Sequence, residues 1–212
     1  MKKNILVFDL DGTLIKSKKD IIESFNLALK KYQIKIDDSF FLKNSSLGSF
    51  YFLKKIFRSD KKKLNIVLDN FRKIYYKNCT KSTKLTPGVK KFLKWTVKNN
   101  YINVVSTNKS LKLSVKILRH FGLLNYFKKI YAFDNTNFQK PNKRHLENII
   151  SDFKTIPKNT FYFGDSQIDS EMSLSCGVTF ILLKNGYTNL AQSKIYKNKL
   201  IKDFNEININ TF

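Results

Sequence analysis

The chain has 212 residues, of which 42% are hydrophobic, and this proportion excludes a protein that is disordered throughout. Its two cysteines, Cys79 and Cys176, exclude a disulfide framework and a cysteine metal cluster, so we expect a reducing, cytoplasmic setting. The formal net charge is +24, but the positive residues are nearly all lysines scattered along the sequence, which disfavours specific nucleic-acid recognition.

The first expected element is a buried strand over residues 4–8, which ends at Asp9. Because Asp9 interrupts the apolar run so early, the run is too short for the core of a signal peptide. No other stretch of the sequence approaches the roughly 20 apolar residues that cross a bilayer. We therefore expect a soluble protein with no membrane partner.

A helical block follows the first strand. Ser17 is expected to begin its first helix, with Asp20 three residues later in a pattern that resembles a capping box. Apolar residues then recur at the spacing of a helix. This spacing covers residues 21–32, 40–57 and 64–76.

Beyond Pro87 the pattern changes to helices that alternate with strands. The expected helices cover residues 89–98, 111–121, 142–153 and 168–175. The expected strands cover residues 102–106, 129–133, 160–163 and 178–183. Such alternation predicts an α/β fold with a Rossmann-like parallel sheet and right-handed crossovers. The sequence after residue 185 has no clear assignment.

The helical block interrupts the α/β pattern and therefore predicts two domains. We expect an α/β core domain formed by residues 1–15 and 84–212, and a helical domain formed by residues 16–83. Short hinges near residues 14–16 and 81–86 would join them.

Two pairs of carboxylates, Asp9 with Asp11 and Asp165 with Asp169, follow strand-like apolar runs. Because the carboxyl ends of parallel strands meet at one edge of a sheet, we expect these four side chains to converge there. Their mutual repulsion calls for a divalent cation. Oxygen ligands without a nearby histidine or cysteine favour Mg²⁺ over zinc.

Four motifs of this sequence resemble those of the haloacid dehalogenase superfamily, in the same order. They are FDLDGTL at residues 8–14, VVSTNK at residues 104–109, Lys140-Pro141, and FGDSQID at residues 163–169. The resemblance covers residues 5 to about 187. It implies a Rossmann-like core with an inserted helical cap, and a phosphatase that works through an aspartyl phosphate.

The resemblance also implies a role for each motif residue. Asp9 would be the nucleophile, and Asp11 would act first as general acid and then as general base. Lys140 would neutralise phosphoryl charge and hold Asp9 in place. The phosphoryl group would be bound by Leu10, Asp11, Gly12, Thr107, Asn108 and Lys140. Magnesium would be held by the Asp9 side chain, the Asp11 carbonyl and Asp165, with Asp169 acting through water or as a support.

The inserted helices resemble the cap that closes over the site in this superfamily and favours small phosphorylated metabolites. Within the cap, Lys43, Asn44 and Gly48 are candidates for contacts with the substrate. The Thr-Asn-Lys motif and the loop at residues 185–187 resemble phosphoglycolate phosphatases, which makes 2-phosphoglycolate the expected substrate. Lys16 and Lys143 depart from that group, where an acidic residue and a proline are common.

Several alternatives remain open from the sequence. A sugar phosphomutase, a pyrophosphatase or a nucleotidase of the same superfamily would use the same carboxylates. A basic nucleic-acid-binding protein built on an enzyme fold is an alternative of a different class. His120 and His145 lie on helical patterns without a partner histidine or cysteine, so we interpret both as non-catalytic.

Overall fold

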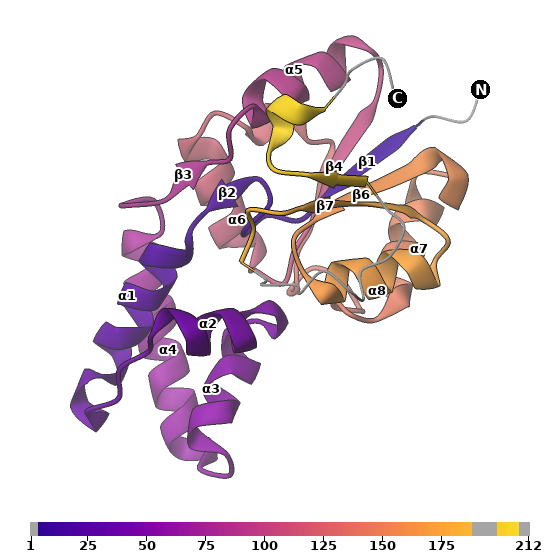
Figure 1. Ribbon diagram of the computed structural model, residues 1–212. Helices are drawn as coiled ribbons and strands as arrows, with labels where there is room; N and C mark the ends of the chain where they lie inside the picture. The colour runs from indigo at the N-terminus through magenta and orange to yellow at the C-terminus, as the bar shows by residue number, and fades with distance from the viewer. Residues whose placement is uncertain (1–3, 188–198, 208–212) are drawn as a thin grey trace. The chain divides into compact units, whose positions relative to one another are not determined.

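The computed structural model describes residues 4–187 and 199–207, which form two compact units (Figure 1). The core unit comprises Met1–Lys16 and Leu85–Phe212, and the helical unit comprises Ser17–Lys84. Each boundary lies one residue further along the chain than the sequence analysis placed it. The short strands β2 (Ile15–Lys16) and β3 (Lys84–Leu85) pair with each other where the chain passes between the units.

The core unit is built on a six-stranded sheet with the strand order β5-β4-β1-β6-β7-β8. Its strands are β1 (Ile5–Phe8), β4 (Ile102–Ser106), β5 (Lys129–Tyr131), β6 (Thr160–Gly164), β7 (Thr179–Leu183) and β8 (Lys199–Ile201). Neighbouring strands run parallel, and Phe8 of β1 lies opposite Val105 and Phe163. Every residue of β1 is buried, as parallel sheets covered on both faces require. The expected α/β fold is confirmed.

Helices cover both faces of this sheet, with α7 and α8 below it and α5 above it in Figure 1. The helices are α5 (Val89–Lys98), α6 (Leu111–His120), α7 (Lys143–Asp152) and α8 (Gln167–Ser175). On one face, Val7 of β1 packs in an apolar cluster with Leu146 of α7 and Met172 of α8. On the other face, Phe8 stacks on Phe163, with ring centroids 4.8 Å apart.

Two details of the core unit differ from the sequence analysis. The strand expected over residues 129–133 ends at Tyr131, because the Asn135 side chain accepts from the Ala132 amide and donates to the Ile130 carbonyl. The unassigned C-terminal region contributes the edge strand β8 and a turn at Phe204–Glu206, whose Phe204 ring packs on Phe8 and Phe163.

The helical unit contains α1 (Lys18–Leu29), α2 (Asp38–Asn44), α3 (Ser49–Phe57) and α4 (Lys61–Asn78), with 3-10 turns at Lys30–Tyr32 and Ser45–Leu47. Its centre is aromatic, since Phe25 stacks on both Phe52 and Phe71. Gly48, with a φ of 88°, separates α2 from α3 within the single helical pattern expected over residues 40–57. Among the described residues, no helix is long and apolar enough to cross a bilayer.

The capping box expected at Ser17 is wrong. Within the described chain, the Ser17 side chain makes no capping hydrogen bond. Asp20 is buried, and its carboxylate instead accepts from the amides of Ser82 and Thr83 and from the Thr83 hydroxyl, at 2.7–3.0 Å. The carboxylate therefore joins the first helix of this unit to the segment that follows its last helix.

Candidate active site

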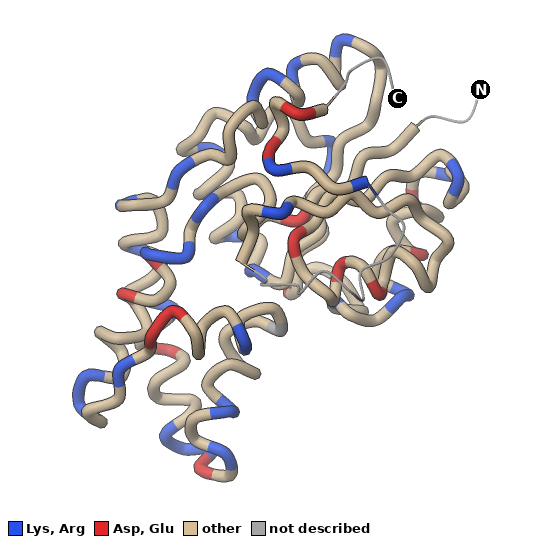
Figure 2. The backbone as a smooth tube through the Cα atoms, in the orientation of Figure 1, with Lys and Arg blue, Asp and Glu red and all other residues tan. Residues whose placement is uncertain are grey.

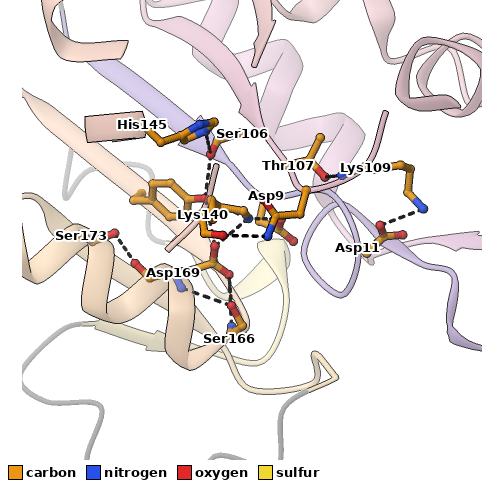
Figure 3. Close-up of polar contacts among 12 residues, drawn as sticks. Asp9, Asp11, Ser106, Thr107, Lys109, Lys140, His145, Ser166, Asp169 and Ser173 are labelled. Carbon is orange, nitrogen blue, oxygen red and sulfur yellow. Dashed lines mark hydrogen bonds and ion pairs between the residues drawn. The ribbon is translucent and has the colours of Figure 1, made fainter. Parts of the chain in front are cut away.

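Three buried carboxylates meet at the carboxyl ends of the two central strands, and Figure 3 shows two of them, Asp9 and Asp169, on either side of Lys140. Asp9 follows β1 directly, and Asp165 follows β6, the neighbour of β1 in the sheet. Asp169 lies in the first turn of α8. One carboxylate oxygen from each of the three lies within 4.8 Å of the others. Strand order thus assembles residues that are far apart in the sequence.

Asp169 is held from both sides by hydrogen bonds. Ser166 caps α8 by accepting from the Asp169 amide, and in return Oδ2 accepts from the Ser166 hydroxyl at 2.5 Å and the Ser166 amide at 3.3 Å. Oδ1 lies 2.8 Å from the Lys140 ammonium and 3.0 Å from the Tyr162 hydroxyl. An ionised carboxylate has about four acceptor positions. These contacts therefore favour Asp169 as a support for the site over a direct metal ligand.

The ammonium of Lys140 lies between two of these carboxylates. Its Nζ is 2.6 Å from Asp9 Oδ1 and 2.8 Å from Asp169 Oδ1, and the side chain is only 4% exposed. Burial alone would lower the pKa of Lys140, but Asp169 and Asp9 raise it well above its usual range. Lys140 is therefore a fixed positive charge beside Asp9.

This single ammonium does not compensate the three carboxylates. Burial raises the pKa of Asp9 to about 7; Lys140 opposes that rise, and Asp169 and Asp11 add to it. Burial, reinforced by Asp9 and Asp169, also raises the pKa of Asp165 well above its usual range. The site needs more positive charge to keep these groups ionised. Its all-oxygen donor set fits a hard divalent cation such as Mg²⁺.

The side chain of Asp11 lies outside the carboxylate group. Its Oδ2 is 3.0 Å from the ammonium of Lys109, whose side chain is 7% exposed (Figure 3). The sequence analysis expected four converging carboxylates, whereas the structure brings together the other three among the residues it describes. The Asp11 carboxylate therefore differs from Asp9 in its surroundings, because it pairs with Lys109 apart from the three carboxylates among which Asp9 lies.

Two glycines make room for Asp165. A Cβ on Gly12, whose φ is 85°, would lie 2.1 Å from Asp165 Oδ2, and a Cβ on Gly186 would lie 2.1 Å from Asp165 Cβ. The Tyr187 amide donates to Asp165 Oδ2 at 2.5 Å. The amide of Gly12 donates to the Ile15 carbonyl at 2.8 Å. We therefore infer that Gly12 serves phosphoryl binding by shaping the turn after Asp9.

The remaining motif residues form the loops around Asp9. The carbonyl of Leu10 accepts from Leu14 and Ile15, which closes the loop after Asp9. Thr107 is buried at the end of β4, and its hydroxyl accepts from the Lys109 amide at 3.1 Å. The Asn108 amide group donates to the Lys140 carbonyl at 3.2 Å, which ties the second motif to the third.

Residues 6–183 match the family of haloacid dehalogenase-like hydrolases. The chain belongs to this family. The match covers all four motifs, so the resemblance inferred from the sequence is confirmed, and with it the expected class of phosphoric monoester hydrolase.

Proteins similar to this haloacid dehalogenase-like hydrolase share almost its full length. The phosphoglycolate phosphatase of Mesorhizobium japonicum is 26% identical over 215 residues, covering 99% of this chain and 95% of its own. The phosphoglycolate phosphatase of Aquifex aeolicus is 29% identical over 190 residues, covering 88% of this chain and 87% of its own. A crystal structure of a predicted phosphoglycolate phosphatase from Haemophilus somnus 129pt gives a TM-score of 0.87 at 25% identity, and 96% of each chain is covered.

The three candidate substrate contacts of this hydrolase lie in its helical unit. Lys43 is exposed on α2, the Asn44 side chain donates to the Phe40 carbonyl at 2.8 Å, and Gly48 directly precedes α3. Their contact with a substrate stays a prediction.

Three residues that the sequence analysis did not assign to the site are linked to Lys140 by hydrogen bonds. Tyr162 Oη is 3.3 Å from Lys140 Nζ, Ser106 Oγ is 3.0 Å from Tyr162 Oη, and His145 Nε2 is 2.9 Å from Ser106 Oγ. Their signal in the sequence is weak: Ser106 and Tyr162 are polar groups within apolar strands, and His145 lies on an apolar helix face.

Proposed function

We propose that this hydrolase releases phosphate from a small phosphomonoester through an aspartyl phosphate on Asp9, with Mg²⁺ as cofactor and 2-phosphoglycolate as the best candidate substrate. The observation that carries the proposal is the placement of Asp9 at the end of the central strand, bound by Lys140 and beside Asp165 and Asp169. The names of the curated relatives supply the candidate substrate.

In the first step, an Asp9 carboxylate oxygen attacks phosphorus and the bond from phosphorus to the ester oxygen breaks. Lys140 binds Asp9 Oδ1 and so fixes the orientation of the nucleophile while its charge offsets that of the phosphoryl group. Asp11 gives a proton to the leaving oxygen, and the ammonium of Lys109, 3.0 Å from Asp11 Oδ2, pairs with the carboxylate that remains.

In the second step, Asp11 takes a proton from water as the water oxygen attacks phosphorus. The bond between phosphorus and the Asp9 oxygen breaks, which releases phosphate and restores the carboxylate. Thr107 and the amides of the loops after β1 and β4 would bind the phosphoryl oxygens throughout.

The cation would be held by the Asp9 side chain, the Asp11 carbonyl and Asp165, while Asp169 supports Lys140 and the start of α8. When bound, magnesium would supply the positive charge that keeps Asp9 ionised and offsets charge on the phosphoryl group. We infer that the helical unit is the substrate-selecting cap of the family, with Lys43, Asn44 and Gly48 as its candidate contacts.

The proposal is tested by measuring phosphate release from 2-phosphoglycolate, sugar phosphates, nucleotides and pyrophosphate. The wild type is assayed with Mg²⁺ and with excess chelator, beside Asp9→Asn and Asp11→Asn. We expect release that requires Mg²⁺, is abolished in Asp9→Asn, and falls about 10²–10⁴-fold in Asp11→Asn. Release that continues in folded Asp9→Asn would contradict the mechanism, and a better substrate elsewhere in the panel would replace 2-phosphoglycolate.

A further inference from the structure

The position of the Lys140 ammonium is determined by more than its two carboxylate partners. A lysine side chain is a flexible stem, so a buried ammonium is held where its acceptors are held. Its third contact is the hydroxyl of Tyr162, at 3.3 Å, and this hydroxyl also lies 3.0 Å from Asp169 Oδ1. The Tyr162 hydroxyl therefore contacts both the Lys140 ammonium and the Asp169 carboxylate, and these two groups also contact each other.

From Tyr162 a chain of hydrogen bonds, buried as far as His145, leads back to the loop that carries Lys140, and Figure 3 shows its contact between Ser106 and His145. Tyr162 Oη lies 3.0 Å from Ser106 Oγ, and Ser106 Oγ lies 2.9 Å from His145 Nε2. His145 Nδ1 lies 2.7 Å from the carbonyl oxygen of Phe138, two residues before Lys140. The contacts thus form a closed ring that joins β4, β6, α7 and this loop.

The protons in this ring can be assigned from the chemistry of its members. A carbonyl oxygen only accepts, so His145 must donate from Nδ1. Burial lowers the pKa of His145 to about 4, so at neutral pH its imidazole is uncharged and Nε2 is an acceptor. Ser106 therefore gives its single proton to His145 and can only accept from Tyr162. The proton of the Tyr162 hydroxyl is shared between Ser106 and Asp169. The oxygen of this hydroxyl accepts from the Lys140 ammonium.

We propose that Tyr162, Ser106 and His145 are positioning residues, whose hydrogen-bonded ring holds the Lys140 ammonium against Asp9 and Asp169 for phosphoryl transfer. The catalytic part of this proposal rests on the proposed function. Without the Tyr162 hydroxyl, the Lys140 ammonium would lose a contact and Ser106 and Asp169 would lose a partner. A misplaced charge beside the nucleophile lowers the rate of the chemical step more than it lowers substrate binding.

The variants Tyr162→Phe and Ser106→Ala each remove one oxygen from the ring without adding atoms. Thr160→Val is the matched control, because Thr160 is also buried on β6 and also loses one hydrogen bond, to the Ile156 carbonyl. Among the described residues, the Thr160 hydroxyl makes no hydrogen bond to a member of the ring. Thermal unfolding establishes that each variant is folded. Should Tyr162→Phe fail to fold, Ser106→Ala breaks the same ring at a smaller side chain.

We expect kcat to fall about 10–100-fold in Tyr162→Phe and in Ser106→Ala, with KM within about twofold of the wild type. The double variant should be no slower than the slower single variant, because both changes break one ring. Thr160→Val should keep the kcat of the wild type.

A second measurement does not depend on turnover. In protein labelled with nitrogen-15 at lysine, a buried ammonium that exchanges slowly gives its own NMR signal, and Lys140→Met identifies the signal of Lys140. We expect this signal to shift and to exchange faster in Tyr162→Phe and Ser106→Ala, and to stay unchanged in Thr160→Val. Labelled histidine should show His145 protonated on Nδ1 alone at neutral pH.

A Lys140 signal that is unchanged in both folded ring variants overturns the proposal, as does a kcat within twofold of the wild type in both. Failure of the proposed function looks different. In that case the wild type releases no phosphate from any member of the panel, while the Lys140 signal still reports whether the ring holds the ammonium.

Discussion

Asp165 shows how closely single residues are fitted to one another in this site. Gly186 has no side chain, and a Cβ there would overlap the Asp165 side chain at 2.1 Å from its Cβ. We expect Gly186→Ala to displace Asp165 and to raise the Mg²⁺ concentration for half-maximal phosphate release about 10–100-fold. Lys184→Ala, an exposed change in the same loop, should leave that concentration unchanged. Equal magnesium dependence of the two variants would contradict the proposed role of Asp165.

The buried His145 should make the stability of the fold depend on pH. Burial lowers the pKa of His145 in the folded state to about 4 from an ordinary value of 6.5; the hydrogen bond to the Phe138 carbonyl and the charge of Asp169 oppose this shift, and nearby Lys140 assists it. Between pH 4 and pH 6.5 the unfolded chain therefore binds more protons than the folded chain. The contribution of His145 to the free energy of unfolding, about 3 kcal/mol, is present above pH 6.5 and is lost as the pH falls to 4.

The His145→Gln variant lacks this titrating group. We expect its free energy of unfolding, measured in urea, to fall less between pH 7 and pH 4.5 than that of the wild type, by up to about 3 kcal/mol. Both proteins are compared in the same Mg²⁺ concentration, so that the titration of Asp9 and Asp165 affects them alike. An identical pH dependence in the two proteins would show that the imidazole is not held neutral in the fold.

At the scale of elements, Asp20 is the side chain that closes the helical unit. Its buried carboxylate on α1 accepts from the backbone of Ser82 and Thr83, beyond the end of α4. Asp20→Asn keeps the shape but loses charge-assisted acceptors, so we expect a loss of about 1–3 kcal/mol in the free energy of unfolding. Asp69→Asn, exposed on α4 near Arg72, should cost less than about 0.5 kcal/mol. A similar cost for both variants would show that the Asp20 contacts contribute little.

The elements of the core could be predicted because their apolar spacing is a local property. The expected bounds of α5 and β4 agree with the structure at both ends, since each is a clean helical or strand pattern between polar turns. Strand β8 could not be predicted in this way, because three residues with two of them exposed acquire their conformation from pairing with β7.

In the candidate site, too, only the residues with a local sequence pattern could be predicted. Its motif residues were found because each lies next to a strand end, so order along the chain predicts that they meet. The contacts among Tyr162, Ser106 and His145 could not be predicted, because they depend on which side chains of β4, β6 and α7 face one another in the fold. The capping pattern is equally ambiguous in sequence: Ser166 with Asp169 forms the box, whereas Ser17 with Asp20 does not, because tertiary partners bind Asp20.

The net charge of the chain is +24, although only Lys140 and Lys109 pair with carboxylates of the site among the described residues. Figure 2 shows lysine and arginine positions along both units, on many helices and strands. A charge distributed in this way attracts anions over a distance set by the ionic strength, roughly 30 Å at 0.01 M salt and 8 Å at 0.15 M. It lacks the fixed donor pairs that read bases, because arginine occurs only at Arg58, Arg72, Arg119 and Arg144.

We therefore expect the charge to act on substrate capture and not on chemistry. Between about 0.01 M and 0.2 M salt, KM for an anionic phosphomonoester should rise severalfold while kcat changes by less than about twofold. In a gel shift, duplex DNA should be retained at low salt and released near 0.15 M salt, as non-specific contacts require. Retention at physiological salt in excess competitor DNA would instead support the nucleic-acid-binding alternative, because counterion release alone does not sustain sequence-selective binding under those conditions.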